Sequence, residues 1–211
     1  APVLPTLTGG NVLLIDCGAN VDCKPNMLKD FALMGNAYMK SVLNVKEPRV
    51  ALLSNGTEDS KGNELTHAAF EILKTLPLNF VGNMEARDLT SGNYDVVVTD
   101  GFAGNVALKA SEGIANMMLK LIKNEVYKTA KGKLGGLLLK DSFRNVKKVM
   151  DYNDKGGAPF LGVKKIVIKS HGSSKASSIY GSILQVLNMY ENQLISKIEE
   201  ALSATAETKA E

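Results

Sequence analysis

Three stretches of the chain share one pattern, in which an apolar run is followed by a polar loop with glycine and then by a segment of helical periodicity. The apolar runs are residues 11–16, 49–54 and 95–98, and the periodic segments are residues 25–42, 65–76 and 106–122. Three consecutive valines, Val96 to Val98, are typical of a strand that is buried on both faces. Repeated units of strand, loop and helix predict right-handed crossovers, and therefore an α/β fold with a mostly parallel, doubly wound sheet flanked by helices.

The rest of the chain adds shorter signals. Residues 2–6 are expected to be extended, residues 79–82 to form a short strand, and residues 165–168 to form another buried strand. One long final helix is predicted from the apolar stripe between Ile179 and Leu202, long enough to cover the sheet or to pair with a second subunit. We therefore expect one α/β domain over residues 1–202, followed by a small, polar, disordered tail over residues 203–211.

Candidate chemistry lies where the predicted strands end. Asp100-Gly101 and Gly104-Asn105 follow the valine strand and open a helix. Open α/β sheets bind ligands at the carboxyl ends of their strands, and glycines at a helix amino end let backbone N–H groups approach an anion. The alternative is a tight turn with a helix cap.

Two further side chains are candidates. Lys61 stands just before a predicted helix, where the helix dipole disfavours a lysine, so it is either a solvated loop residue or a cation that faces an anionic ligand. His171 follows the predicted strand 165–168 and has either a structural or a functional role. Cys17 and Cys23 lie far in sequence from both histidines, which favours buried reduced thiols over a metal or redox pair. We expect no metal site.

Composition and charge narrow the function classes. The 211 residues are 45% hydrophobic, enough for a sizeable core, and the net charge of +3 is too small to indicate nucleic-acid binding. No apolar run reaches the length of a membrane span and no secretory signal opens the chain, which favours a cytoplasmic protein. The glycines form neither a dinucleotide fingerprint nor a P-loop, and we expect no cofactor.

The positive charge is concentrated in one segment. Residues 120–150 hold nine basic and two acidic residues, a local net charge of +7. We predict an amphipathic basic helical hairpin over residues 114–150, with a leucine-rich tip between Leu134 and Leu139. This tip either dips into an anionic membrane surface or packs on a partner subunit.

Five segments together resemble the phosphate acyltransferases of bacterial phospholipid synthesis, the PlsX family. The resemblance runs from the first residues to about Leu202 and keeps the family's order of motifs. The segments are Leu13-Leu14-Ile15-Asp16-Cys17-Gly18-Ala19-Asn20-Val21-Asp22, Lys61-Gly62-Asn63-Glu64-Leu65-Thr66, Asn79-Phe80-Val81-Gly82-Asn83 with Glu85-Ala86-Arg87-Asp88, Asp95-Val96-Val97-Val98-Thr99-Asp100-Gly101-Phe102 with Gly104-Asn105-Val106, and Ser170-His171-Gly172-Ser173-Ser174.

The resemblance implies a fold similar to that of the isocitrate and isopropylmalate dehydrogenases. It implies transfer of a fatty acyl group from acyl carrier protein to inorganic phosphate, which gives an acyl phosphate. It also implies a homodimer that associates peripherally with the membrane through the hairpin. Members of the family begin with about a further third of chain, so this chain is expected to be a carboxyl-terminal fragment of two thirds. The alternatives are a short-chain enzyme that uses coenzyme A thioesters and a non-catalytic, dimerising and membrane-binding fragment.

The resemblance also assigns residues. Attack of phosphate on a thioester needs an anion site and stabilisation of the tetrahedral intermediate, but no enzyme nucleophile. Lys61 is expected to hold the phosphate or the developing oxyanion, and Asn105 to donate to the same centre. We expect the loops that carry them to converge on one anion pocket. The implied substrate-binding residues are Gly18, Asn20, Asn63, Asp100, Gly101, Gly104 and His171.

Overall fold

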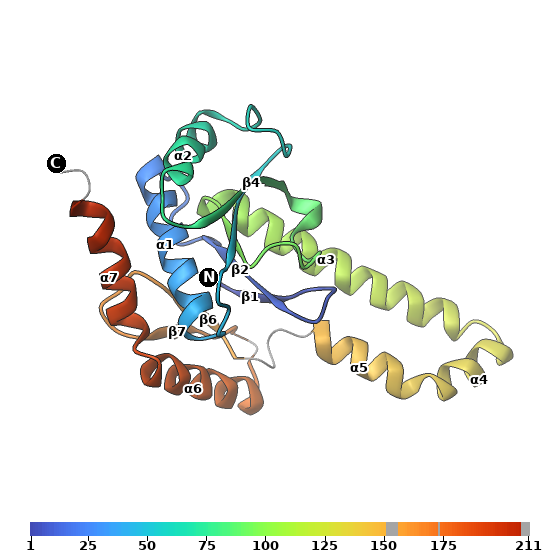
Figure 1. The fold of residues 1–211 in the computed structure, drawn as a ribbon. Helices are drawn as coiled ribbons and strands as arrows, with labels where there is room; N and C mark the ends of the chain where they lie inside the picture. The colour runs from blue at the N-terminus through green and yellow to red at the C-terminus, as the bar shows by residue number, and fades with distance from the viewer. Residues whose placement is uncertain (151–155, 173, 208–211) are drawn as a thin grey trace.

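A five-stranded sheet forms the centre of the fold (Figure 1). The computed structural model describes residues 1–150, 156–172 and 174–207. The strands lie in the order β1-β2-β5-β3-β4, and all are parallel except β1, which runs antiparallel to β2. Their bounds are β1 Val3–Pro5, β2 Asn11–Ile15, β3 Arg49–Ser54, β4 Asn79–Glu85 and β5 Val96–Val98. A mostly parallel sheet flanked by helices is thus confirmed.

Helices cover both faces of the sheet. Successive side chains of a strand point to opposite faces, so the apolar strands present side chains that need cover on each face. Val96 and Val98 join one apolar cluster with α1 (Pro25–Ser41) and α2 (Glu64–Lys74), whereas Val97 joins another with Leu108 of α3 (Gly101–Val126). Gly35 lets α1 approach the central strand, since a Cβ there would lie 2.6 Å from Val96 Cγ1. A short 3-10 helix, η1 (Ala86–Asp88), follows β4.

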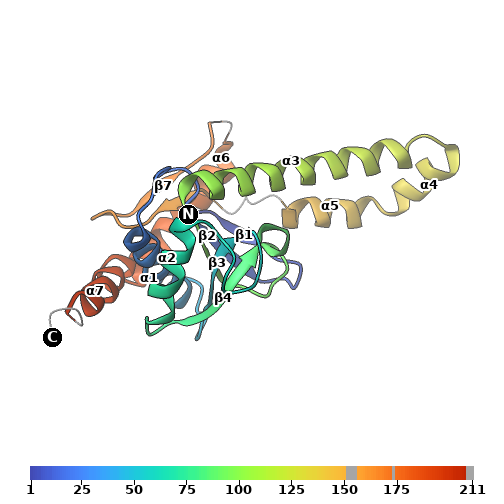
Figure 2. The same cartoon turned by 90° about the horizontal axis from the view of Figure 1, so that it is seen from above.

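Three helices form an arm that extends beyond the sheet. In Figures 1 and 2, α3 runs outward, α4 (Ala130–Leu138) lies at the far end, and α5 (Lys140–Met150) returns beside α3. Gly136 lets α4 pack against the end of α3, because a Cβ there would lie 2.7 Å from Val126 Cγ1. Residues 110–150 are called the helical arm below. No helix among the described residues is long and apolar enough to cross a lipid bilayer.

Two predictions for the carboxyl-terminal part were wrong. The strand expected at residues 165–168 is β7 (Val167–Lys169), which pairs antiparallel with β6 (Ala158–Phe160) outside the main sheet and is largely exposed. The expected single final helix is divided into α6 (Ala176–Glu191) and α7 (Leu194–Glu207), because Gln193 adopts a left-handed backbone conformation with φ of 53°.

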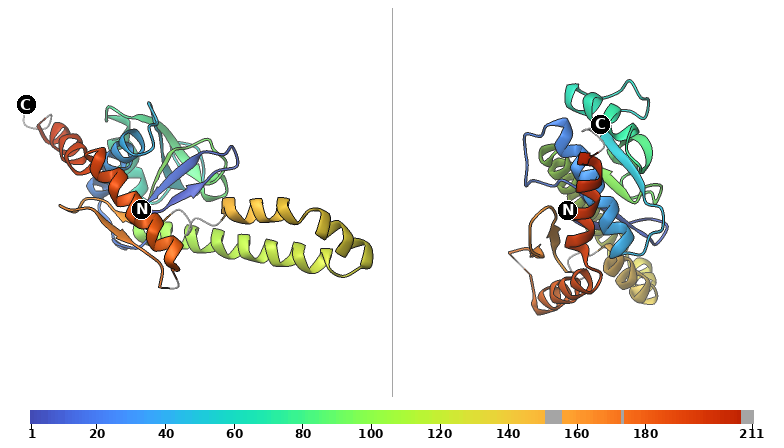
Figure 3. Two further views of the ribbon diagram at one scale, coloured as in Figure 1. Left: turned by 90° about the horizontal axis from the view of Figure 1, so that it is seen from below. Right: turned by 60° about the vertical axis from the view of Figure 1, so that its left-hand side comes forward.

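These two helices have different surroundings. Helix α7 packs on α1, as the two panels of Figure 3 show, and buries Leu194 and Ile198 there. Helix α6 leaves Ile179, Ile183 and Leu187 exposed. Residues 203–207, which were expected to form a disordered tail, belong to α7. Residues 208–211 lie outside the described residues, and so does Ser173 of the Ser170–Ser174 motif.

Candidate active site

Two polar loops meet at the carboxyl ends of the neighbouring strands β2 and β5. The Gly101 N–H, at the start of α3, donates to the Asn20 carbonyl at 2.8 Å. Gly18 faces the Asn105 side chain, because a Cβ on Gly18 would lie 3.8 Å from both Asn105 Cγ and Nδ2. The expected convergence is therefore found for the loops that carry Gly18, Asn20, Gly101 and Asn105.

The carboxylate of Asp16 organises the first of these loops. Its oxygens accept the backbone N–H groups of Gly18, Ala19 and Asn20 at 2.9, 3.0 and 2.7 Å, and the Asn20 amide at 2.8 Å. Burial alone would raise the pKa of Asp16, but the hydrogen bonds from Ala19 and Asn20 outweigh it and lower the pKa below its ordinary value. These N–H groups therefore bind an internal carboxylate and are not available to an external anion.

The amino end of α3 is also bonded internally. Asp100 is the N-cap residue, and its carboxylate accepts the Ala103 N–H at 2.7 Å. A Cβ on Gly101 would lie 2.6 Å from the Asn20 carbonyl oxygen, and one on Gly104 would lie 1.9 Å from the Asp16 carbonyl oxygen. The helix cap that was the alternative interpretation is present, and the two glycines permit close packing of α3 on the β2 loop.

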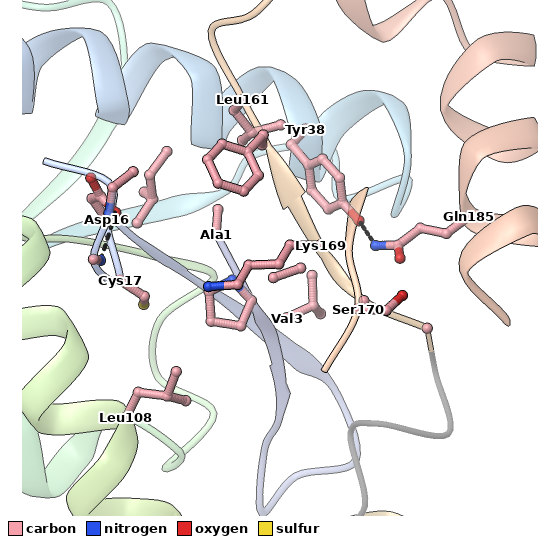
Figure 4. A pocket seen from close by; sticks show the side chains of 18 of the residues that line it. Ala1, Val3, Asp16, Cys17, Tyr38, Leu108, Leu161, Lys169, Ser170 and Gln185 are labelled. Atoms are coloured by element: carbon pink, nitrogen blue, oxygen red, sulfur yellow. Dashed lines mark hydrogen bonds between the residues drawn. The ribbon is translucent and has the colours of Figure 1, made fainter. Parts of the chain in front are cut away.

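A cavity of about 660 Å³ opens beside the two loops (Figure 4). Its walls come from the β2 loop, α1, the inner part of α3, the β6–β7 pair and α6. Four of the predicted site residues line this cavity: Gly18, Asn20, Asn105 and His171. The other predicted residues do not: Lys61, Asn63, Asp100, Gly101 and Gly104 are absent from its lining.

The cavity is polar near the two loops and on its β7 side. Lys109 and Glu112 line it as an ion pair, with Nζ and Oε2 2.8 Å apart, and Lys169 contributes a second ammonium. Asn105, Lys109 and Glu112 are spaced i, i+4 and i+7, so they share one face of α3. The same spacing in the sequence could have placed Lys109 and Glu112 beside Asn105 at the candidate site, but neither residue was predicted there.

The opposite part of the cavity is mainly apolar. Phe31, Met34 and Tyr38 reach it from α1 and Leu184 from α6. Figure 4 shows Asp16 and Cys17 on one side, Tyr38 and Gln185 on the other, and Lys169 between them. Burial raises the pKa of the Tyr38 phenol, whose oxygen accepts a hydrogen bond from Gln185 Nε2 at 3.2 Å. An elongated ligand with an apolar chain and an anionic end matches this division.

Lys61 and Asn63 lie in a different part of the structure. Their loop follows β3, which lies beside β5 on the side away from β2. Asn63 is the N-cap of α2, and its Oδ1 accepts the Thr66 N–H at 2.9 Å. Lys61 is exposed and does not line the cavity that Asn105 lines. The expected meeting of Lys61 and Asn105 in one pocket is not found at this cavity, and the catalytic role of Lys61 stays a prediction.

Metal chemistry has no built site in the part of the chain that is described. No group of three or more His, Cys, Asp or Glu side chains there is arranged to hold a metal ion. Cys17 and Cys23 are free thiols, and burial raises the pKa of Cys17 to about 12.

The mostly parallel sheet, with a part-polar, part-apolar cavity beside the ends of β2 and β5, defines an α/β protein with a cavity where open α/β sheets usually bind small ligands. The profile of the family described as "fatty acid synthesis protein" matches residues 1–197, and the chain belongs to that family.

Curated relatives agree with this membership. A protein of Halalkalibacterium halodurans is 51% identical over 206 residues, which is 97% of this chain and 61% of the relative. One of Clostridium novyi is 48% identical over 94% of this chain and 60% of the relative, and one of Oceanobacillus iheyensis is 46% identical over 100% and 64%. All three are named phosphate acyltransferase. The chain thus spans roughly three fifths of the length of these relatives.

Proposed function

We propose that the chain is part of an enzyme that transfers a fatty acyl group from acyl carrier protein to inorganic phosphate. A phosphate oxygen attacks the thioester carbonyl carbon, the carbon–sulfur bond breaks, and the carrier leaves as a thiolate. The products are an acyl phosphate and free carrier. The observation that carries this proposal is the cavity with cationic and amide groups near Asn105 and an apolar wall from α1 and α6. Family membership and the relatives' names support it.

The proposed roles follow the position of each group. Asn105 donates to the oxyanion of the tetrahedral intermediate, and Gly18 and Asn20 form the wall beside it. His171 lines the same cavity and is the candidate proton carrier. The resemblance assigns the phosphate to Lys61 and assigns contacts with the substrate to Asn63, Asp100, Gly101 and Gly104. Lys169, which lines the cavity, is the rival phosphate cation.

The test measures acyl phosphate, trapped by hydroxylamine, from acyl carrier protein thioester and phosphate. It uses the long form, meaning this chain continued to the full length of its relatives. Loss of one preorganised oxyanion donor costs about 100- to 1000-fold in kcat, so we expect Asn105→Ala to lose that much while it stays folded. Exposed Lys197 of α7 gives the matched control, Lys197→Ala. Near-normal turnover by Asn105→Ala would refute the proposed role of the cavity.

A direct comparison decides between the two candidate phosphate cations. If Lys61 holds the phosphate, Lys61→Ala raises the KM for phosphate and lowers kcat, and Lys169→Ala does so weakly. The reverse order assigns the phosphate to the cavity described above. Because both substitutions remove one positive charge, a general electrostatic effect is the same in both.

The acyl donor distinguishes the proposal from a short-chain alternative. An enzyme that uses coenzyme A thioesters of short acids has the same chemistry, but the apolar wall of Phe31, Met34 and Leu184 favours a long chain. We therefore expect acyl carrier protein loaded with a palmitoyl group to be a better donor than acetyl coenzyme A, judged by kcat/KM. A preference for acetyl coenzyme A would support the alternative.

A second candidate function is that of a non-catalytic binding module. The exposed leucines at the end of the helical arm favour it, because such a module needs a surface for a membrane or a second subunit. Parallel assays of the 211-residue chain and the long form separate the two possibilities. Activity confined to the long form, with lipid binding by both, would support the module.

The helical arm is proposed to bind an anionic membrane surface from the cytoplasmic side. Leu134, Leu137 and Leu138 at its end are 63%, 65% and 79% exposed. Lysines 131, 133 and 140 flank them, which suits an interface with anionic lipid. A homodimer is the other proposed use of the arm, because α3 also exposes Ile114, Met118 and Leu121.

Vesicle binding tests the arm. Replacement of Leu137 and Leu138 by glutamate is expected to release the protein from vesicles of phosphatidylglycerol and phosphatidylcholine without unfolding it. Replacement of Ile114 and Met118 by glutamate is the matched variant, and it is expected to change the mass measured by light scattering. If the leucine variant binds vesicles normally and loses dimer mass, the end of the arm is a subunit interface.

Two finer proposals complete this assignment. The fold is proposed to be of the isocitrate and isopropylmalate dehydrogenase type, as the resemblance implies. The acidic acyl carrier protein is proposed to dock on some of the lysines between Lys120 and Lys148, since complementary charge speeds association. A salt-sensitive KM for the carrier that is lost on charge reversal of Lys131 and Lys133 is the expected result.

A further inference from the structure

A buried amide connects β4 to the loop that carries Lys61. Asn83 is only 4% exposed, and its Nδ2 donates to the Glu58 carbonyl at 2.9 Å and to the Lys61 carbonyl at 3.4 Å. These contacts span 25 and 22 residues of sequence. A single side chain on the edge strand of the sheet thus bonds two carbonyls of the same short loop.

The loop is fixed at other points as well. The Lys61 N–H donates to the Glu58 carbonyl at 3.0 Å, which closes a turn inside the loop. Gly62 has φ of +127°, a conformation that favours glycine, and Asn63 then caps α2. The Lys61 stem lies over buried Gly56, where a Cβ would be 2.6 Å from Lys61 Cγ. Backbone and stem of Lys61 are both held, while the residue as a whole is exposed.

Asn83 is an unusual choice for a purely structural position. Its Oδ1 is buried and has no hydrogen-bond partner in the described part of the chain. A buried polar atom without a partner destabilises a fold, and an apolar residue of the same size would avoid that cost. What an apolar residue cannot supply is the pair of hydrogen bonds to the loop. This comparison indicates that the Asn83 amide is present to hydrogen-bond the loop and not to stabilise the core.

We propose that Asn83 is a positioning residue that holds the Lys61 ammonium in a fixed place relative to the sheet. None of the ion pairs between described residues includes Lys61, although the Glu58 carboxylate lies beside its stem: a Cβ on Gly56 would be 2.9 Å from Glu58 Oε2 and 2.6 Å from Lys61 Cγ. A lysine with a fixed stem loses little conformational entropy when it binds an anion. The inference rests on the proposed role of Lys61 in phosphate binding, but the hold on the loop is a separate, measurable property.

The hold is tested in the 211-residue chain by hydrogen exchange. Asn83→Leu removes both donors and keeps the number of side-chain heavy atoms, and it is expected to accelerate exchange of the Lys61 amide, which donates to the Glu58 carbonyl, at least tenfold. The melting temperature is expected to stay level or rise, because the unpaired oxygen is gone. Asn79→Leu is the control on the same strand, where no side-chain hydrogen bond joins Asn79 to the described residues, and it should leave that exchange unchanged.

A second variant covers the case in which leucine does not fold at this site. Asn83→Ser is smaller and too short to reach either carbonyl, so it should give the same faster exchange. Unchanged exchange of the Lys61 amide in a folded variant would overturn the proposal.

Kinetics of the long form connect the hold to function. We expect Lys61→Ala to lower kcat/KM for phosphate by about 100- to 1000-fold and Asn83→Leu by about 10- to 100-fold. The double variant should be no worse than Lys61→Ala alone, because both act through one ammonium. If Asn83→Leu exchanges faster but Lys61→Ala keeps a normal kcat/KM for phosphate, the role of Lys61 in phosphate binding is refuted, whereas the contact between Asn83 and the loop is supported. Additive losses, or a harmless Asn83→Leu beside a damaging Lys61→Ala, would overturn Asn83 as a positioning residue.

Discussion

Gly104→Ala is expected to disturb the contact on which the cavity wall depends. The new Cβ would lie 1.9 Å from the Asp16 carbonyl oxygen and 2.6 Å from Thr99 Cγ2. The nearest atom belongs to the backbone, so no side-chain rotation relieves the overlap. The amino end of α3 must therefore move away from the β2 loop.

The cost can be worked from these contacts. A clash that a well-packed core cannot absorb costs about 1–3 kcal/mol, and the short distance to a backbone oxygen favours the upper value. Separation of the two elements also weakens the hydrogen bond from Gly101 to Asn20, worth about 1 kcal/mol. The helix propensity of alanine returns about 1 kcal/mol. The net loss is about 3 kcal/mol of unfolding free energy.

Gly113 gives a matched control in the same helix. A Cβ there meets nothing within 4 Å, so Gly113→Ala should gain up to about 1 kcal/mol from helix propensity alone. For a chain of this size, Gly104→Ala should lower the melting temperature by roughly 6–12 °C and Gly113→Ala should raise it by roughly 2–4 °C. Urea unfolding followed by circular dichroism measures both. Equal stability of the two variants would refute the packing role assigned to Gly104.

Two more predictions follow from the pKa shifts. Because the folded pKa of Asp16 is below its ordinary 3.8, its contribution to stability is present above that value and is lost as pH falls from 3.8 through the folded pKa. Asp16→Asn should therefore flatten the loss of stability below pH 3.8, whereas exposed Asp59→Asn should not. With a pKa of about 12 in place of 9.0, Cys17 holds about 1000-fold less thiolate at pH 8 than an ordinary thiol, so it should react with iodoacetamide correspondingly slowly; rapid labelling in the Cys23→Ser variant would contradict its burial.

The apolar runs correctly predicted the parallel strands of the main sheet, because a strand that is buried on both faces has a continuous run of apolar residues in its sequence. The valines 96–98 are fully buried and pair with both β2 and β3. The run at residues 165–168 has a similar composition, yet β7 is exposed and belongs to a separate pair. A short apolar run does not state which sheet it joins, since that depends on contacts distant in sequence.

The prediction of a single final helix was wrong for a local reason. The stripe from Ile179 to Leu202 keeps helical spacing across the break, so periodicity alone predicts one helix. A single left-handed residue, Gln193, redirects the chain and lets α7 reach α1. Glutamine has no strong preference for that conformation, and the turn is fixed by the packing that follows it.

The candidate site was found in part because parallel strands end at one edge. That rule brings together Gly18, Asn20 and Asn105, but it does not give the order of strands across the sheet. Lys61 follows β3, which lies on the other side of β5, and the order β2-β5-β3 is set by long-range pairing. The N–H groups at the amino end of α3 were assigned to a ligand because Asp100 was counted among the substrate-binding residues, whereas its carboxylate caps the helix.

One continuous helix, α3, forms both the first part of the arm and part of the cavity wall. Its 26 residues span about 39 Å, with Asn105 and Leu108 at the inner end and Leu121 far out on the arm. Gly104 closely approaches the Asp16 carbonyl one residue before Asn105, so a tilt of α3 about this contact that moves Leu121 by several ångströms would move Asn105 by only a fraction of one. Under the proposed role of Asn105, that fraction is the scale on which an oxyanion donor is aligned.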